Sequence, residues 1–287
     1  MLQYILKRLL IIPPALVLVH FIGFSYAHIV RPLRAQGNPY LASTIEETPL
    51  LDAYLENLKA ITSDGMGQLT SLQTGKAAPF FDVILESILN SFGLLFIALI
   101  ISVIVGIALG LVATQTNPVR SARWLTSLAS IGLAMPSFFL GSLFFAAWFM
   151  AVKLFGPEVT DLLPPFQGFG WDSHLIIPTL VMIARPTVQI AQITSSMLVE
   201  EMNKQYVKAA RSIGHTWRTI RVRHAFRNIL SASMLTIASS VRILVAELIV
   251  VEWMFNWPGI GNLLAKSLIP SQVASVFSAG NIALFLN

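Results

Sequence analysis

Long segments without charged residues alternate with short polar segments along this chain. No Asp, Glu, Lys or Arg occurs in residues 9–30, 87–119 or 124–152. Residues 174–199 and 228–251 are also apolar, and each is interrupted by an arginine. All five segments supply the roughly 20 predominantly apolar residues that a membrane-spanning helix needs. The pattern therefore predicts five complete transmembrane helices.

A sixth apolar segment, residues 273–286, is shorter, about half of the roughly 20 residues of a complete span. Backbone exposed to lipid must form its hydrogen bonds within a helix or a closed barrel, and these runs are too long and continuous for barrel strands. We therefore expect an all-α polytopic membrane protein with about six transmembrane helices, of which the sixth is short.

The N-terminus shares features with a secretory signal peptide. Lys7 and Arg8 precede an apolar run, but that run is longer than a usual signal core and contains Pro13-Pro14. We therefore interpret residues 1–30 as a first transmembrane helix that is retained in the protein.

Proline and glycine predict local features within the spans. Pro136, Pro178 and Pro186 fall within the third and fourth predicted spans, and each favours a kink because proline removes a backbone donor. Gly106 and Gly110 in the second span form a GxxxG pattern, which allows close packing against another helix.

Two longer polar segments separate the spans. Residues 31–81 contain one amphipathic patch with leucines and a tyrosine at helical spacing, centred on Tyr54, which predicts a short helix near the membrane surface. Residues 154–173 are rich in proline and glycine and predict an irregular loop.

The overall composition agrees with a membrane protein. Hydrophobic residues make up 55% of the chain, charged residues 11%, and the mean hydropathy is +0.72, which excludes an ordinary soluble domain. The chain has no cysteine, so disulfides and thiolate chemistry are excluded. We expect no bound nucleic acid, because the distribution of the basic residues in the segments between the spans accounts for the positive charge. We expect no metal site, because no third ligand lies near His20 and His28.

The distribution of charge predicts an orientation. With the N-terminus in the cytoplasm, the inside segments hold eleven Lys or Arg residues against two acids, Glu200 and Glu201. The outside segments then hold six Lys or Arg residues and eleven acids. Because short cytoplasmic loops carry an excess of Lys and Arg, we expect the N-terminus to be cytoplasmic.

One inside segment is far more basic than orientation requires. Residues 204–227, the basic segment, contain seven Lys or Arg and no acid. Tyr206 and Ala210 belong to an apolar set at helical spacing, Gly214 is placed to end that helix, and a second helix is expected from Trp217. Such a helix–turn–helix with mixed faces either lies on anionic lipid or docks into a groove of a partner.

Ionisable side chains also occur inside the predicted membrane spans. Arg185 and Arg242 lie near the centres of the fourth and fifth spans, where an arginine costs roughly 2.5–3.5 kcal/mol and should face the protein interior or water. Glu247 follows Arg242 by five positions, so the two do not share a helix face. Gln189 and Gln192 continue a polar stripe from Arg185. These residues either line a translocation path or form structural contacts between helices.

Three stretches resemble one family of membrane proteins. "EEMNKQYVKAARSIGHTWRTIRVRHAFRNIL", residues 200–230, closely resembles the cytoplasmic coupling loop of binding-protein-dependent ABC importer permeases. Lys208-Ala209-Ala210 stands for the family's Glu-Ala-Ala triplet and Gly214 for its glycine. "VEWMFNWPGIGNLL", residues 251–264, and the opening "YILKRLL" resemble motifs of the dipeptide/oligopeptide branch.

The resemblance implies a type I ABC importer permease fold with a cytoplasmic coupling helix. Residues 1–30 would be the first helix, 31–81 an extracytoplasmic loop and 82–287 the permease core, with the coupling loop at 200–228. It places these residues in the ATPase-coupling loop: Tyr206, Ala209, Ala210, Arg211, Gly214 and Arg218. It places these in an outer re-entrant segment: Trp257, Pro258, Gly259 and Gly261. The translocation path would include Arg185, Gln189, Gln192, Arg242 and Glu247.

The resemblance also implies partners. These are a second permease chain, expected to be a different one, two ATPase subunits, an extracytoplasmic solute-binding protein and membrane lipid. ATP and Mg would be bound by the ATPase subunits, since this chain has no GxxxxGK[ST] phosphate-binding loop. We therefore expect no catalytic residue and no cofactor in this chain. It would lie in the cytoplasmic membrane of a bacterium or archaeon and import peptides, nickel chelates, glutathione or similar solutes.

Two other functions are compatible with a multi-span protein. A permease-like subunit without transport activity would serve as a scaffold in a larger membrane complex. An ion channel or secondary carrier should show inverted repeats or paired broken helices, and the sequence shows neither.

Overall fold

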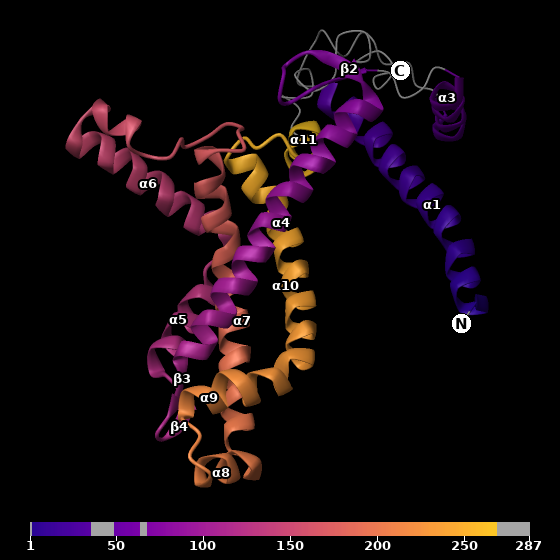
Figure 1. Ribbon diagram of the computed structural model, residues 1–287. Helices are drawn as coiled ribbons and strands as arrows, with labels where there is room; N and C mark the ends of the chain where they lie inside the picture. Colours follow the sequence, from indigo (N-terminus) through magenta and orange to yellow (C-terminus); the bar gives the residue numbers. More distant parts are fainter. Residues whose placement is uncertain (1, 36–48, 64–67, 269–287) are drawn as a thin grey trace. The chain divides into compact units, whose positions relative to one another are not determined.

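The computed structural model describes residues 2–35, 49–63 and 68–268 (Figure 1). The chain forms two compact units, one that includes the residues up to Ile84 and one formed by Leu85–Lys266. Most described residues are helical, and the only strands in the described ranges form two short hairpins. The prediction of an all-α polytopic protein is confirmed.

The first unit contains two helices and a hairpin. These are α1 (Leu2–Ala35), α3 (Leu50–Ser63) and the antiparallel strands β1 (Gln68–Thr70) and β2 (Ala77–Pro79). The short amphipathic helix predicted around Tyr54 is therefore confirmed as α3. Tyr54 is buried against α1, where its hydroxyl lies 3.2 Å from His20 Nδ1 and its ring packs on Phe21. His20 thus has a structural contact.

Four helices are long and apolar enough to cross a membrane: α4 (Phe80–Ala113), α6 (Ser137–Phe155), α7 (Ile176–Met202) and α10 (Phe226–Met254). Within α1 the apolar part is shorter, Leu10–Tyr26. Each of the five predicted complete spans therefore falls on helical structure. The sixth, residues 273–286, lies outside the described residues.

The third predicted span differs from the prediction. The sequence predicts one kinked helix over residues 124–152, but the structure has α5 (Arg123–Ala134), a break, and then α6. Met135 and Pro136 both have extended backbone, with ψ of 118° and 152°. The residue before a proline is disfavoured in helical conformation, so this proline ends one helix and begins the next. Pro186, in contrast, lies inside α7, which continues past it.

The second predicted span also ends earlier than expected. The apolar run reaches residue 119, but α4 ends at Ala113 and the chain turns through the hairpin β3 (Thr114–Thr116) and β4 (Val119–Ser121). Thr114 closes the helix by donating its hydroxyl to the Gly110 carbonyl at 2.8 Å. The loop at 154–173 is irregular as predicted, apart from the 3₁₀ turn η1 (Pro157–Asp161). A second 3₁₀ turn, η2 (Ser173–Leu175), leads directly into α7.

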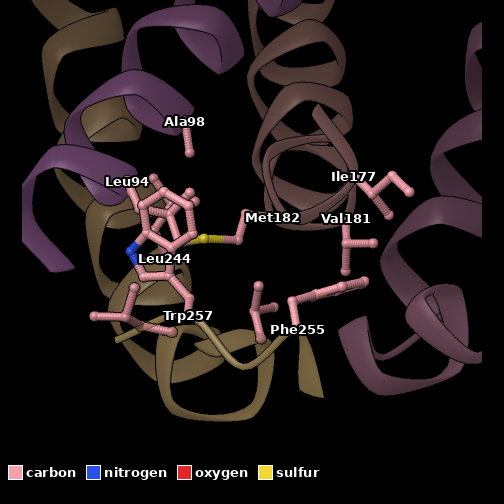
Figure 2. Close-up of a cluster of buried hydrophobic side chains, with 10 residues drawn as sticks. Leu94, Ala98, Ile177, Val181, Met182, Leu244, Phe255 and Trp257 are labelled. Atoms are coloured by element: carbon pink, nitrogen blue, oxygen red, sulfur yellow. The ribbon is translucent and has the colours of Figure 1, made fainter. Parts of the chain in front are cut away.

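α7 is the central helix of the second unit and packs against α5, α6 and α10 (Figure 1). One buried apolar cluster joins α4, α7 and α10 to the chain that follows α10 (Figure 2). Its largest members are Trp257 and Phe255, which are fully buried, with Met182, Leu94 and Leu244 around them. This cluster fixes the end of α10 against α4 and α7.

The GxxxG pattern of α4 packs closely on α7. A Cβ atom at Gly106 would lie 2.8 Å from the Ile190 Cβ, and one at Gly110 would lie 2.7 Å from the Thr194 Cβ. Cβ atoms do not approach so closely, so only glycine allows α4 to sit this near to α7. The predicted close helix packing is confirmed.

We expect Gly110→Ala to destabilise the protein by about 1–3 kcal/mol, because the new methyl group must displace Thr194 and the Ala191 carbonyl. The melting temperature of the detergent-solubilised protein measures this effect. Gly23→Ala in α1 is the control, because a Cβ there meets nothing within 4 Å. Equal melting temperatures for both variants would contradict the close packing.

Candidate functional site

The basic segment forms a helix, a glycine turn and a second helical stretch. α8 (Gln205–Ser212) is followed by Gly214 at φ +93°, then by α9 (Trp217–Thr219) and the π-helical turn η3 (Ile220–Ala225), which runs directly into α10. A positive φ of this size favours glycine. The predicted helix–turn–helix is therefore confirmed. It lies at the opposite end of α10 from α11 (Ile260–Leu268) (Figure 1).

The apolar face of α8 is occupied by the protein's own core. Val207 is buried with Leu198 of α7, Ile220 of η3 and Ile229 of α10. Ala210 is half-buried against the same cluster, whereas Ala209 is exposed. The face of α8 that remains exposed is basic and small, with these residues: Lys208, Ala209, Arg211 and Ser212.

A buried carboxylate that sequence reasoning missed anchors this segment. Glu201 at the end of α7 accepts hydrogen bonds from Lys204 Nζ at 2.5 Å, Tyr206 Oη at 3.0 Å and Asn228 Nδ2 at 2.9 Å. These contacts join α7, α8 and α10 at one point. The sequence does show an acid shortly before the basic segment. The charge pattern alone, however, uses that acid only to predict the orientation of the chain.

The partners of this carboxylate stay protonated at neutral pH. Burial, with a further contribution from the Glu201 hydrogen bond, raises the pKa of Tyr206 to about 12. The hydrogen bond to Glu201 also raises the pKa of Lys204 above its ordinary value. A donor whose pKa is raised keeps its proton until the pH exceeds that value, so both side chains remain donors to Glu201 at neutral pH.

The arginines of the basic segment have different surroundings. Arg211 stacks its guanidinium 4.6 Å from the Trp217 ring and donates to the His215 carbonyl at 2.8 Å, which closes the turn at Gly214. Arg221 donates to the Thr114 carbonyl at 2.8 Å and so ties η3 to the end of α4. Arg218 is exposed.

The charged residues predicted within the spans have two different surroundings: two of them form an ion pair, and the third is exposed. Arg185 of α7 and Glu247 of α10 form an ion pair of 2.7 Å, and Glu247 is buried. Gln189 donates to Ser239 at 3.2 Å, which adds a second polar contact between the same helices. Arg242 is exposed on another side of α10. The expectation that Arg242 and Glu247 do not form a close pair is confirmed.

Gln192, the next residue of the predicted polar stripe, is half-buried on α7. The stripe also reaches Ser195, which is fully buried and lies 2.9 Å from the Ser121 hydroxyl. Only part of the stripe is therefore accessible on this chain, and the rest forms contacts between helices.

The Trp-Pro-Gly loop, residues 257–261, is fixed to α4 by reciprocal hydrogen bonds. Trp257 Nε1 donates to the Asn90 carbonyl at 3.2 Å, and Asn90 Nδ2 donates to the Pro258 carbonyl at 3.1 Å. Ser91 Oγ accepts from the Ile260 amide at 2.8 Å. Sequence reasoning identified the loop but not its partners on α4, which lie more than 160 positions earlier.

A second buried carboxylate fills the space beneath this loop. Glu252 accepts from Ser91 Oγ at 2.5 Å and from the amides of Gly261 at 2.7 Å and Asn262 at 3.2 Å. The amides belong to the first turn of α11, where a negative charge is favoured. A Cβ at Gly259 would collide with this carboxylate, and one at Gly261 would lie 2.7 Å from the Ile249 Cα. Both glycines are therefore required by close packing.

Comparison with known protein families shows which family of membrane proteins this chain belongs to. The family of the binding-protein-dependent transport system inner membrane component matches residues 102–287. The chain belongs to this family. It is the permease subunit of a binding-protein-dependent ABC importer and a multi-pass membrane protein. The matched range includes the basic segment, the Arg185–Glu247 pair and the Trp-Pro-Gly loop, so all three lie in the part of the chain that matches the family.

Curated relatives support the same class over nearly the whole permease. The metal-staphylopine import system permease protein CntB of Staphylococcus aureus (strain NCTC 8325) is 28% identical over 284 residues, covering 94% of this chain and 87% of that protein. The glutathione transport system permease protein GsiC of Escherichia coli (strain K12) is 26% identical over 279 residues, covering 93% and 87%. The resemblance to importer permeases is therefore confirmed.

Proposed function

We propose that this permease imports small peptide-like solutes with energy from ATP hydrolysed by two partner ATPase subunits. One observation carries the proposal: α8 presents an exposed basic face while its apolar face is fixed to α7, η3 and α10. A partner that moves α8 therefore moves the ends of two spans with it. The glutathione and metal-staphylopine permeases among its relatives support a small chelate or peptide-like solute.

The contacts of α8 explain how such movement would be transmitted. Glu201 joins the end of α7 to Tyr206 on α8, and η3 continues into α10 without a break. Arg221 adds a link to the end of α4. Three spans thus end at one small region, and a rigid displacement of that region would tilt them together, as in domain shear around a bound solute.

The remaining partners follow from the same proposal. The basic segment would face the cytoplasm, with the N-terminus on the same side, because basic loops remain inside. A second, different permease chain would complete the transport path, and a solute-binding protein would deliver the solute from outside near the Trp-Pro-Gly loop. ATP and Mg would be held by the ATPase subunits. The tight fixing of that loop on α4 suits a surface that must keep its shape during docking.

The test is whether Gly214→Asp separates the permease from its ATPase. We expect the variant to lose ATPase copurification or the stimulation of ATP hydrolysis by the solute-binding protein, about tenfold or more, because a side chain at φ +93° distorts the turn beside α8. Gly156→Asp is the matched control, since Gly156 has φ +86° and equally open surroundings at the other end of the spans. Equal ATPase coupling in both variants would overturn the proposal, and retained coupling without uptake would favour a scaffold.

A further inference from the structure

One face of α10 is exposed and carries a single charged residue near the middle of the helix. Its members recur every three or four positions, so they form one continuous face. All of them are exposed: Leu235, Ala238, Arg242, Val245 and Ile249. Arg242 lies twelve positions before the end of α10 at Met254, which places it well inside the span.

The acidic groups of α10 do not neutralise this arginine. Glu247 is five positions away, on a different side of the helix, and it pairs with Arg185 at 2.7 Å. Glu252 is fully buried and accepts its hydrogen bonds from Ser91 and the start of α11. Among the described residues, Arg242 forms no ion pair.

An unpaired guanidinium at this depth requires water or another polar surface. Polar groups extend from it towards the neighbouring helix. Ser239 lies three positions before Arg242, is half-buried, and receives the hydrogen bond from Gln189 of α7. Ala238, four positions before Arg242 on the same face, is also exposed and carries only a methyl group. This part of α10 thus carries two polar features, the Arg242 guanidinium and the Gln189–Ser239 contact, among exposed aliphatic side chains.

We propose that Arg242 contacts the anionic group of the transported solute, so that the permease favours solutes that carry a carboxylate or a similar oxyanion. This inference rests on the proposed import function and adds the chemical class of the cargo. A guanidinium binds a carboxylate through two parallel hydrogen bonds, and it stays charged at every physiological pH. The Arg185–Glu247 pair leaves no unpaired acid beside it to attract a cation. The path thus presents net positive charge where α10 meets it.

The absence of cysteine in this chain allows a direct test with a single reporter thiol. Ala238→Cys in the full importer is treated in membranes with anionic 2-sulfonatoethyl methanethiosulfonate and with cationic 2-trimethylammonioethyl methanethiosulfonate. We expect both reagents to label the thiol at position 238. Arg242 should raise the ratio of the anionic to the cationic labelling rate about fivefold or more, as expected for one charge at close range. Arg242→Gln in the same background should remove this gain, and Arg242→Lys should keep it.

Two results would overturn the inference. Failure of both reagents to label the native importer, with full labelling after denaturation, would show that lipid or a second chain covers this face. Labelling with a reagent preference that Arg242→Gln leaves unchanged would show that the arginine does not select anions. Neither result depends on ATPase coupling, which Gly214→Asp tests separately, so each proposal can fail without the other.

Discussion

Replacing Glu247 with Leu is expected to destabilise the permease by about 3–5 kcal/mol. The substitution leaves the Arg185 guanidinium inside the span without the carboxylate that now lies 2.7 Å from it. An uncompensated charge in such a position is among the costliest consequences of a single mutation. Reversible unfolding of the purified permease in mixed micelles with increasing dodecyl sulfate measures the change.

The double variant Arg185→Leu/Glu247→Leu distinguishes two causes of destabilisation, the unpaired charge and the loss of side-chain packing. Replacing both charges with apolar groups removes the unpaired guanidinium, so we expect stability to return to within about 1–2 kcal/mol of the wild type. If the two single variants and the double variant show additive losses, the ion pair does not join α7 to α10 as described.

Replacing Glu252 with Leu should have a similarly large effect, about 3 kcal/mol or more. Three donors would lose their acceptor in a fully buried site: the Ser91 hydroxyl and the amides of Gly261 and Asn262. Each buried donor left without a partner costs about 1–3 kcal/mol. Trp257 is buried beside this site, so its fluorescence and the protease sensitivity of the Trp-Pro-Gly loop report the loss.

Glu252→Gln is the graded comparison for this prediction. Glutamine keeps one acceptor oxygen and nearly the same volume, so it should lose less stability than leucine and keep the loop protected from protease. Leucine and glutamine variants that behave alike, both near the wild type, would show that the carboxylate does not hold the loop on α4.

The membrane fold follows from the sequence because long uncharged runs have few alternatives in a bilayer. The runs located every spanning helix in the described residues, and Gly106 and Gly110 indicated where two helices meet. The break at Pro136 could not be predicted from hydropathy, because hydropathy does not distinguish a kinked helix from two helices joined by two extended residues. The early end of α4 was missed for a related reason, since Thr114 and the following residues are uncharged but turn into a hairpin.

The candidate site was predictable in its segments and not in its long-range contacts. The turn at Gly214 and the small face of α8 follow from local spacing. Glu201 holds α8 in place and Glu252 holds the Trp-Pro-Gly loop. Each accepts a hydrogen bond from a helix distant in the sequence, so no local pattern could reveal these contacts. The same limit applies to Arg185 and Arg242, which the sequence places alike near the centres of two spans. Only the packing shows that one is paired with Glu247 and the other exposed.

Cross-linking from α8 tests the central claim most directly, because it identifies what this surface contacts. Ala209→Cys introduces a single thiol on the exposed face of α8, and Leu162→Cys introduces one on the loop after α6, where the side chain is 85% exposed. With a thiol-reactive photo-cross-linker in membranes, we predict that the thiol at position 209 forms an adduct with an ATPase subunit and that the thiol at position 162 does not. Absence of an ATPase adduct at position 209, with both thiols fully labelled, would contradict the assignment of α8 as the coupling surface.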